Sequence, residues 1–301
     1  MKILVTGGNG FIASHLCESL VKSGYSVTSI DRNFDSNSKK LECEKIQADI
    51  TKFDSLIEKI KNSDIVIHLA ATSRVDPCQE CPISCFEINV IVVLKIIEAM
   101  KGTKSKLIFA SSREVYGEPK KIPVKESDEK NPLTVYGSSK LAAEQLLKTY
   151  RKLFDLNYVT IRFANVYGSP RDLPQRVIPR FIDLAKKGEP FTINGGNQII
   201  DFTFIDDVVD GITNVVEKIS SDKGDYMGEA YNFATGTGTS VRDLAKLIKE
   251  IFNSSSEMKF DNERNYDVQN FVGDFSKAKS IFSFEPKHNL EEGLEKYKHR
   301  F

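Results

Sequence analysis

The sequence has no net charge and no dense block of charge of one sign. Its 301 residues include 42 Lys and Arg against 42 Asp and Glu, and the two signs are interspersed along the chain. Proteins that bind nucleic acids usually carry a clustered basic surface. We therefore expect no nucleic acid and no other polyanionic partner.

Long apolar segments are missing as well. The longest run of hydrophobic residues, Val90 to Leu94, ends at Lys95, whereas a membrane-spanning helix needs about 20 apolar residues. The first residues turn glycine-rich at Gly7, before the apolar core of a signal peptide could form. These absences predict a soluble, cytoplasmic protein without a membrane partner.

Glycine, proline and cysteine are all sparse. With 18 Gly and 10 Pro, the chain lies far below the share of about 25–30% that marks low-complexity sequences, which predicts a globular protein with one or two cores. The five cysteines are odd in number, which argues against a disulfide framework. Cys78, Cys81 and Cys85 could supply three metal ligands, but no fourth Cys or His lies at pairing distance. We predict buried or half-exposed thiols and no metal site.

Short β-rich runs alternate with helix-length segments through the first half of the chain. The expected strands are Ile3–Thr6, Tyr25–Ile30, Ile65–Ala70, Leu107–Ser111 and Tyr158–Phe163. The expected helices, with apolar residues at three- and four-residue spacing, are Phe11–Ser23, Phe53–Lys61, Phe86–Met100 and Ser138–Phe154. This order predicts an α/β fold with a Rossmann-type doubly wound parallel sheet. From Gly168 onwards, proline-marked loops and shorter elements predict a second, smaller domain, with a ligand cleft between the two.

A glycine-rich turn joins the first expected strand to the first expected helix. Gly7 permits the tight turn, Gly10 allows a pyrophosphate to approach the helix N-terminus, and Ala13 lets helix and strand pack closely. Asp31 ends the next strand about 20 residues later, where its carboxylate can accept hydrogen bonds from both ribose hydroxyls. That charge would repel a 2′-phosphate, so the pattern predicts NAD rather than NADP, with Arg32 leaving NADP as the alternative.

Tyr136 and Lys140 stand four residues apart at the start of an expected helix and therefore share one face. A tyrosine with a pKa near 10 is a poor base at neutral pH, and lowering that pKa by about three units requires about 4 kcal/mol. An ammonium group about 4 Å away supplies a Coulomb energy of that size at an effective dielectric near 20. The pair predicts an acid–base tyrosine tuned by a lysine.

Further motifs follow in an order typical of one enzyme family. They are Thr6–Ile12, Asp49-Ile50, His68–Ala71, Ser111–Gly117, the Tyr136/Lys140 pair, Arg162–Gly168, Asp201–Asp207, Tyr231-Asn232, Ser276–Lys279 and Leu290–Leu294. Over essentially its whole length the chain resembles the extended short-chain dehydrogenase/reductase family. Within it, the chain is similar to the NAD-dependent nucleotide-sugar epimerase/dehydratase branch, as in UDP-glucose 4-epimerase.

The resemblance implies which residues bind and react. For NAD they are Gly7, Gly10, Phe11, Ile12, Asp31, Asp49, Ile50, Ala70, Tyr136 and Lys140. Ser112, Tyr136 and Lys140 would be catalytic. The nucleotide sugar, most simply a UDP-sugar, would contact Ser112, Asn165 and Arg264, with Arg176 as a supplement to Arg264.

The resemblance also implies how the chain is divided and assembled. An NAD-binding Rossmann domain would comprise residues 1–166, with about 202–235 returning to it, and a smaller nucleotide-sugar domain would comprise 167–201 and 236–301. A homodimer would form through a four-helix bundle built from the helices expected at Phe86–Met100 and Ser138–Phe154. Apolar surface for this contact is expected at Ile91, Leu94, Leu146 and Leu147.

The implied reaction begins when the Tyr136 phenolate takes a proton from a sugar hydroxyl while a hydride leaves the same carbon for the nicotinamide. Ser112 would hydrogen-bond to that oxygen. If the 4-keto sugar turns over and takes the hydride back on its other face, the result is 4-epimerisation, of UDP-glucose/UDP-galactose or their N-acetyl equivalents. The alternatives are decarboxylation, 4,6-dehydration, reduction, epimerisation at another carbon, or a non-catalytic dinucleotide-binding protein.

Several positions depart from the family pattern. The 4,6-dehydratases carry Asp-Glu where this chain has Arg113-Glu114, which disfavours dehydration. Ile200 stands where many relatives have a pyrophosphate-binding arginine, so Arg264 is expected to contribute more of that contact. Val92 and Val93 replace a usual Gly-Thr pair, and helix packing near the active site is expected to differ.

Overall fold

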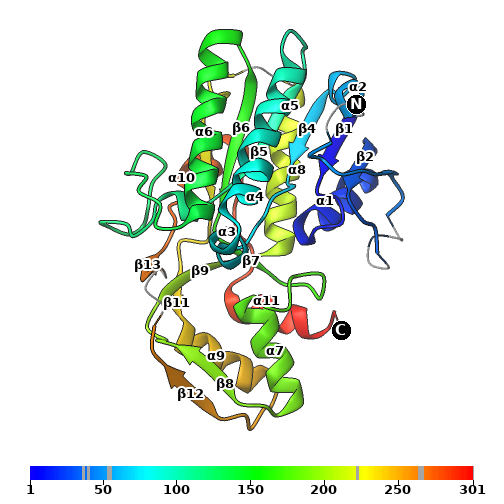
Figure 1. Cartoon of the computed structure of the whole chain (residues 1–301). Coiled ribbons are helices and arrows are strands. Elements are labelled where there is room, and N and C mark those ends of the chain that lie inside the picture. Colours follow the sequence, from blue (N-terminus) through cyan, green and yellow to red (C-terminus); the bar gives the residue numbers. More distant parts are fainter. Residues whose placement is uncertain (36–37, 39–40, 53–55, 222–223, 264–267, 301) are drawn as a thin grey trace.

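A sheet of seven parallel strands forms the centre of the larger part of the molecule (Figure 1). The computed structural model describes residues 1–35, 38, 41–52, 56–221, 224–263 and 268–300. In spatial order, the strands are β10 (Ala230–Phe233), β6 (Asn157–Phe163), β5 (Lys106–Ser112), β4 (Ile65–His68), β1 (Lys2–Thr6), β2 (Ser26–Asp31) and β3 (Glu44–Gln47). The strand order reverses between β4 and β1, and sheets of this kind bind ligands at such a switch point. The predicted Rossmann-type doubly wound parallel sheet is confirmed.

Helices cover both faces of this sheet. They are α1 (Phe11–Lys22) and α8 (Ile205–Ser221) on one face, and α2 (Ile57–Lys61), α5 (Val92–Met100) and α6 (Val135–Phe154) on the other. Ile3 and Val5 of β1 pack on the first face, and Leu4 packs on the second. Because both faces are covered, this strand is apolar at successive positions. In the described ranges, no helix is long and apolar enough to cross a membrane.

The smaller part of the molecule lies below the central sheet in Figure 1 and contains two short sheets. One pairs β8 (Phe191–Asn194) with β12 (Met258–Asp261), and the other joins β7 (Asn165–Tyr167), β9 (Ile199–Phe204), β11 (Gly238–Ser240) and β13 (Asn270–Phe271). Its helices are α7 (Val177–Lys187), α9 (Val241–Ile251) and α11 (Leu290–Lys298), while α10 (Ser276–Phe282) packs against α8 and β10. The limits of the two domains stay a prediction.

The clearest difference between the predicted and the observed elements lies between residues 75 and 100. The sequence predicts a single helix there, over Phe86–Met100. The chain forms α3 (Val75–Glu80), α4 (Pro82–Phe86), the π-helical turn η2 (Glu87–Ile91) and then α5. The turn ends directly before Val92 and Val93, which replace the Gly-Thr pair of the family pattern. Turns of this kind occur often at functional sites.

The break between α3 and α4 brings Cys78 and Cys85 together in a disulfide with their Cα atoms 5.1 Å apart. Seven residues of straight helix would separate those atoms by about 10 Å. The prediction of thiols is therefore wrong for these two residues, because the chain reverses between them. Cys17, Cys43 and Cys81 carry free thiols, and Cys81 is exposed. Among the described residues, no cluster of His, Cys, Asp or Glu could hold a metal ion.

Leu147 corrects one detail of the predicted dimer surface. Its side chain is buried in the core between α6 and the sheet, because it lies on the helix face turned toward β5 and β6. Leu94 and Leu146 are partly buried against the same core. Ile91 is 44% exposed and remains available for a contact.

Candidate active site

A cleft with a volume of about 750 Å³ opens beside the carboxyl ends of β1, β2, β4 and β5 and extends to the smaller part of the molecule. Every predicted site residue that the structure describes lines it: Gly7, Gly10, Phe11, Ile12, Asp31, Asp49, Ile50, Ala70, Ser112, Tyr136, Lys140, Asn165 and Arg176. Arg264 lies outside the described residues. Residues far apart in the sequence are thus brought to one site.

The glycine turn fits the pyrophosphate of a dinucleotide. Gly7 has a φ of +73°, and a Cβ at this position would lie 2.8 Å from the Ala70 backbone. A Cβ on Gly10 would lie 2.9 Å from the Gly7 carbonyl oxygen. Helix α1 starts after Gly10 with no side-chain cap from the described residues, so its first N–H groups point toward the cleft with the positive end of the helix dipole. A glycine-rich turn before a helix whose first N–H groups have no described side-chain cap is a site for a negatively charged phosphate.

Two carboxylates, those of Asp31 and Asp49, line the cleft beside the glycine turn. The Asn9 N–H donates to Asp31 Oδ2 (3.0 Å) and the Asn33 N–H donates to Asp31 Oδ1 (3.2 Å), which fixes the carboxylate at the end of β2. The backbone N–H and the hydroxyl of Thr51 both donate to Asp49 Oδ1 (2.9 and 2.8 Å). The first of these bonds is the main cause that lowers the pKa of Asp49. Both groups are held as acceptors beside the glycine turn.

Tyr136 lies in the first turn of α6, which Thr134 caps by accepting from the Gly137 N–H (3.0 Å). The Tyr136 phenol hydrogen-bonds with Ser112. Burial raises the pKa of Tyr136 to about 12, and the charge of Arg176 is the strongest effect in the opposite direction. The sequence predicts Arg176 only as a phosphate contact. That Arg176, at the start of α7, also lies near Tyr136 is evident only in the folded chain.

Lys140 is fully inside the protein. Its Nζ donates to the Ala110 carbonyl oxygen (2.8 Å) and lies 6.0 Å from the centre of the Tyr136 ring. Burial lowers the pKa of Lys140 to about 8, and the negative charge of Glu144 opposes this. Both side chains line the cleft.

Arg113 organises the other side of the cleft. Its Nη2 pairs with Glu114 Oε1 (2.9 Å), and its Nε donates to Asn165 Oδ1 (2.8 Å). In the part of the chain that the structure describes, no group accepts from the Asn165 amide N–H groups, which face the cleft. Ile200 lines the same cleft from β9, in register with Phe271 of β13, and the Arg113 guanidinium lies 5.5 Å from the Phe271 ring centre.

The loop after β7 adds two charged residues that the sequence analysis misses. Arg171 pairs with Glu18 of α1 (2.7 Å) and ties the loop to the larger part of the molecule. Burial raises the pKa of Asp172 to about 6, and Arg176 Nε lies 3.5 Å from its carboxylate. A loop that no periodic pattern describes offers little signal for such contacts.

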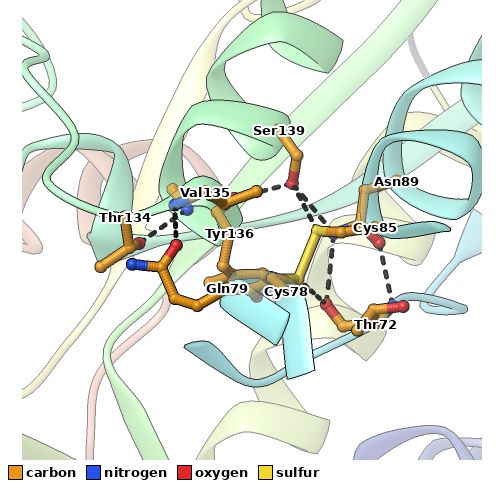
Figure 2. Close-up of a disulfide and its surroundings, with 10 residues drawn as sticks. Thr72, Cys78, Gln79, Cys85, Asn89, Thr134, Val135, Tyr136 and Ser139 are labelled. Atoms are coloured by element: carbon orange, nitrogen blue, oxygen red, sulfur yellow. Dashed lines mark hydrogen bonds between the residues drawn. A yellow bond between two sulfur atoms is a disulfide. The ribbon is translucent and has the colours of Figure 1, made fainter. Parts of the chain in front are cut away.

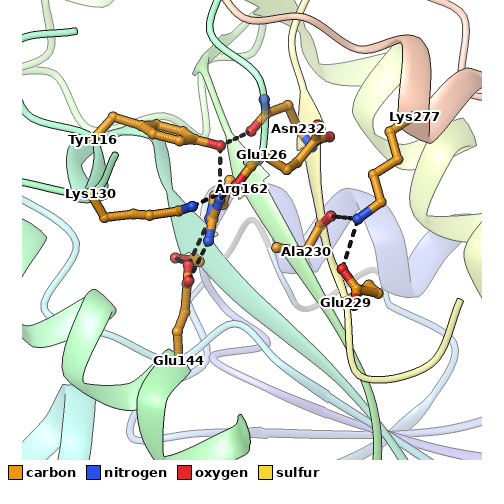
Figure 3. A network of polar contacts seen from close by, with 10 residues as sticks. Tyr116, Glu126, Lys130, Glu144, Arg162, Glu229, Ala230, Asn232 and Lys277 are labelled. Atoms are coloured by element: carbon orange, nitrogen blue, oxygen red, sulfur yellow. Dashed lines mark hydrogen bonds and ion pairs between the residues drawn. The ribbon is translucent and has the colours of Figure 1, made fainter. Parts of the chain in front are cut away.

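A buried polar network supports α6 from behind (Figure 3). Arg162 of β6 pairs with Glu144 of α6 (2.6 Å), and it also donates to the Tyr116 hydroxyl (2.8 Å). That hydroxyl donates to Asn232 Oδ1 of β10 (2.7 Å), and the Ser111 hydroxyl donates to Glu144 (2.6 Å). Three of the motifs that carry the family resemblance therefore meet in a structural network that holds the helix of Tyr136 on the sheet.

Comparisons with known proteins agree with this geometry. The model of the "NAD dependent epimerase/dehydratase family" matches residues 3–234. A protein of Methanocaldococcus jannaschii provisionally named UDP-glucose 4-epimerase is 36% identical over 98% of this chain and 96% of its own length. The human dTDP-D-glucose 4,6-dehydratase is 33% identical over 98% of this chain and 88% of its own. The crystal structure of UDP-glucuronic acid 4-epimerase from Bacillus cereus, in complex with UDP-glucuronic acid and NAD, is 33% identical, with a TM-score of 0.92 over the full length of both chains.

Proposed function

Since the chain belongs to the NAD-dependent epimerase/dehydratase family, we propose that it is a nucleotide-sugar 4-epimerase acting on a UDP-sugar. Its cofactor is NAD. The observation that carries the proposal is that Ser112, Tyr136 and Lys140 line the same cleft as the glycine turn. A non-catalytic dinucleotide-binding protein would have no use for an acid–base tyrosine hydrogen-bonded to a serine at this position.

In this proposal NAD, held by the glycine turn with Asp31 and Asp49, would supply the hydride acceptor and donor for C4 of the sugar. Tyr136 takes the proton of the 4-hydroxyl and gives it back, and the Ser112 hydroxyl donates a hydrogen bond to the same oxygen. The Tyr136 phenol must therefore ionise despite its buried position, and the positive charges of Arg176 and Arg113 favour the phenolate. The resemblance adds Lys140, whose Nζ lies 6.0 Å from the centre of the Tyr136 ring. Asn165 donates to the substrate from its amide N–H groups, since Arg113 occupies only its Oδ1.

The Arg113–Glu114 ion pair favours epimerisation over 4,6-dehydration. Elimination of water from the sugar needs an additional acid and base near C5 and C6. Glu114 is engaged by the guanidinium of Arg113 at 2.9 Å, and both side chains are 12% exposed. Arg113 thus stands in place of one of the two carboxyl groups that the dehydratases carry, and it binds the other.

The test is an NMR time course with purified protein, NAD and a panel of UDP-glucose, UDP-N-acetylglucosamine, UDP-glucuronic acid and dTDP-glucose. We expect the C4 epimer of one UDP-sugar to accumulate to equilibrium without loss of water or carbon dioxide. A 4-keto-6-deoxy product would identify a dehydratase, and a pentose product would identify a decarboxylase. Conversion of none of these sugars would overturn the proposed substrate class.

We also propose that the active form is a homodimer built on α4, η2, α5 and α6. Exposed apolar side chains along α4 and η2 support it: Ile83 is 87% exposed, Phe86 is 38% exposed and Ile91 is 44% exposed. Isolated apolar residues are common on surfaces, but a group on adjoining turns of one segment is typical of an interface. Light scattering at micromolar concentration tests this, and a single species of 33.9 kDa would contradict it.

A further inference from the structure

Two of the free thiols, those of Cys17 and Cys43, meet between α1 and the start of β3. Cys17 is 0% exposed and belongs to the core cluster between α1 and the sheet. Cys43 directly precedes β3, whose pairing with β2 places Lys45 opposite Ser29. Since side chains alternate along a strand and paired residues share a face, Cys43 lies on the face that carries Val27. Val27 belongs to the same cluster as Cys17, and Cys43 packs against that cluster.

The two thiols form a hydrogen bond with each other. This bond is the main cause that lowers the pKa of the Cys43 thiol to about 7, and the positive charge of Lys45 acts in the same direction, against burial and the charge of Glu44. The same bond, burial and the charge of Glu18 raise the pKa of the Cys17 thiol. At neutral pH, Cys43 is therefore partly a thiolate that accepts this hydrogen bond, and Cys17 is the thiol that donates it.

The two sulfurs differ in their access to solvent. Cys43 is half-buried, so a small molecule in solution can reach its sulfur, whereas Cys17 is enclosed in the core. The other three of the five cysteines, all of which the structure describes, differ from this pair: Cys78 and Cys85 are joined in the disulfide of Figure 2, and Cys81 is an exposed thiol. An oxidant can therefore react first at Cys43, with a second thiol already next to it.

We propose that Cys43 and Cys17 form an oxidation site for hydroperoxides, in which Cys43 reacts first and Cys17 closes a reversible disulfide. The Cys43 thiolate attacks one oxygen of the hydroperoxide, the O–O bond breaks, and the other oxygen leaves and takes up a proton. This gives a sulfenic acid on Cys43 and water or an alcohol. Cys17 then attacks the Cys43 sulfur, the S–O bond breaks, and the leaving oxygen takes the Cys17 proton and a further proton as it departs as water. The two sulfurs together lose two electrons, which reduce the hydroperoxide.

The new bond would join two elements that both lead to the cleft. Helix α1 begins at Phe11, and β3 leads on to Ala48 and Asp49, and all three residues line the cleft. A disulfide between α1 and the start of β3 also restricts the unfolded chain more than the folded one. We expect the midpoint temperature of unfolding to rise by about 5 °C or more on oxidation and to return on reduction. Neither the site nor this effect depends on the proposed function.

The experiment treats the full-length protein with equimolar hydrogen peroxide at neutral pH, blocks the remaining thiols by alkylation, and maps the unreduced peptides by tandem mass spectrometry. We expect a peptide pair linked through Cys17 and Cys43, which disappears after treatment with dithiothreitol. Thermal unfolding of the same oxidised and re-reduced samples measures the change in stability.

Three variants separate the roles of the thiols. In Cys17→Ala, the sulfenic acid on Cys43 should persist and be trapped by dimedone, because the thiol that removes it is gone. In Cys43→Ser, Cys17 should oxidise at least about tenfold more slowly than Cys43 does in the parent, because a buried, un-ionised thiol is a poor nucleophile. Cys81→Ser is the matched control: it removes an exposed thiol outside the pair and should form the linked peptides at the parent rate. Should Cys17→Ala fail to fold, Cys17→Ser replaces it.

Two results in the parent protein would overturn the proposal. One is a sulfenic acid that persists on Cys43 without any linked peptides, and the other is a Cys43 that stays a thiol while Cys81 is oxidised. Linked protein that unfolds at the same temperature as the reduced protein would overturn the stabilising effect. These measurements use neither NAD nor a sugar, so their outcome and that of the epimerase assay can be told apart.

Discussion

The two halves of the cleft are built by different means. The proposed cofactor half, formed by Gly7, Gly10, Asp31 and Asp49, depends on backbone shape: a glycine with positive φ, a helix whose start no described side chain caps, and carboxylates fixed by nearby N–H groups. The proposed sugar half, formed by Arg113, Asn165, Arg176 and Ile200, depends on side chains from distant loops and strands. Backbone shape follows from local sequence, whereas long side chains take their positions from tertiary contacts. The cofactor can therefore be predicted from a short motif, but the sugar cannot.

Tyr136→Phe acts at the boundary between the halves and should have the largest effect. Turnover should fall by about 10² or more, because only the transferable proton is lost. The fold and NAD affinity should not change, since the ring that packs in the cleft remains. Steady-state kinetics on the converted UDP-sugar, together with an NAD titration, checks this. Turnover near that of the parent would mean that another group moves the proton.

Gly7→Ala should weaken NAD binding and leave the proposed sugar half of the cleft unchanged. The added Cβ would lie 2.8 Å from the Ala70 backbone, and residue 7 would have to keep its left-handed conformation. If the turn shifts to relieve strain of about 1–3 kcal/mol, NAD affinity should fall by about tenfold to hundredfold. Gly24→Ala is the matched control, because Gly24 has a φ of +82° but nothing within 4 Å of the added atom. It should lose some thermal stability and keep its NAD affinity. Equal loss of NAD affinity in both variants would contradict the steric argument.

Arg264→Ala should weaken binding of the nucleotide sugar and leave the cofactor half unchanged. With Ile200 in place of the usual arginine, the remaining charge-assisted contact to the pyrophosphate is worth about 1.5–3 kcal/mol, so the KM for the nucleotide sugar should rise by more than tenfold. NAD affinity should stay the same. Ile200→Arg should leave the KM unchanged or lower it. If neither substitution alters the KM, the phosphates are bound elsewhere or the substrate is not a nucleotide sugar.

Asp31→Ala should have the smallest effect and sharpens the description of the cofactor half. Loss of hydrogen bonds from the ribose hydroxyls to a carboxylate should weaken NAD binding by about tenfold and narrow its advantage over NADP. Parallel titrations of both cofactors on both proteins measure this difference. Tighter binding of NADP than of NAD by the parent would contradict the assigned role.

The parts of the fold that could be predicted are those in which local pattern and tertiary structure agree. The strand at Ile3–Thr6 is apolar on both faces because helices cover both, and the helix after Gly10 begins where its glycine turn ends. The strand β3 was missed because its burial is partial and its sequence mixes Glu, Lys and Gln with a single Ile. Its position is fixed by pairing with β2 rather than by its own pattern.

The parts that could not be predicted depend on contacts between distant residues. Cys78 and Cys85 form a disulfide only because the chain turns at Cys81, and the continuous apolar pattern that follows concealed that break. Arg176 affects Tyr136 across the cleft from another part of the molecule. In both cases the residue type was noticed in the sequence, but its partner was set by the folded chain.

The buried polar network behind α6 can form only after a late part of the chain has been synthesised. Arg162 and Glu144 are present once β6 has been made, but Asn232 arrives with β10, after the whole segment that contains α7, β8, β9 and α8. Until then β6 is an edge strand, and the Tyr116 hydroxyl lacks Asn232 as its hydrogen-bond acceptor. A nascent or truncated chain that ends before residue 230 therefore has an open sheet edge ready to pair with another chain. The support of the proposed catalytic helix is completed late in synthesis, although the helix itself is made near the middle of the chain.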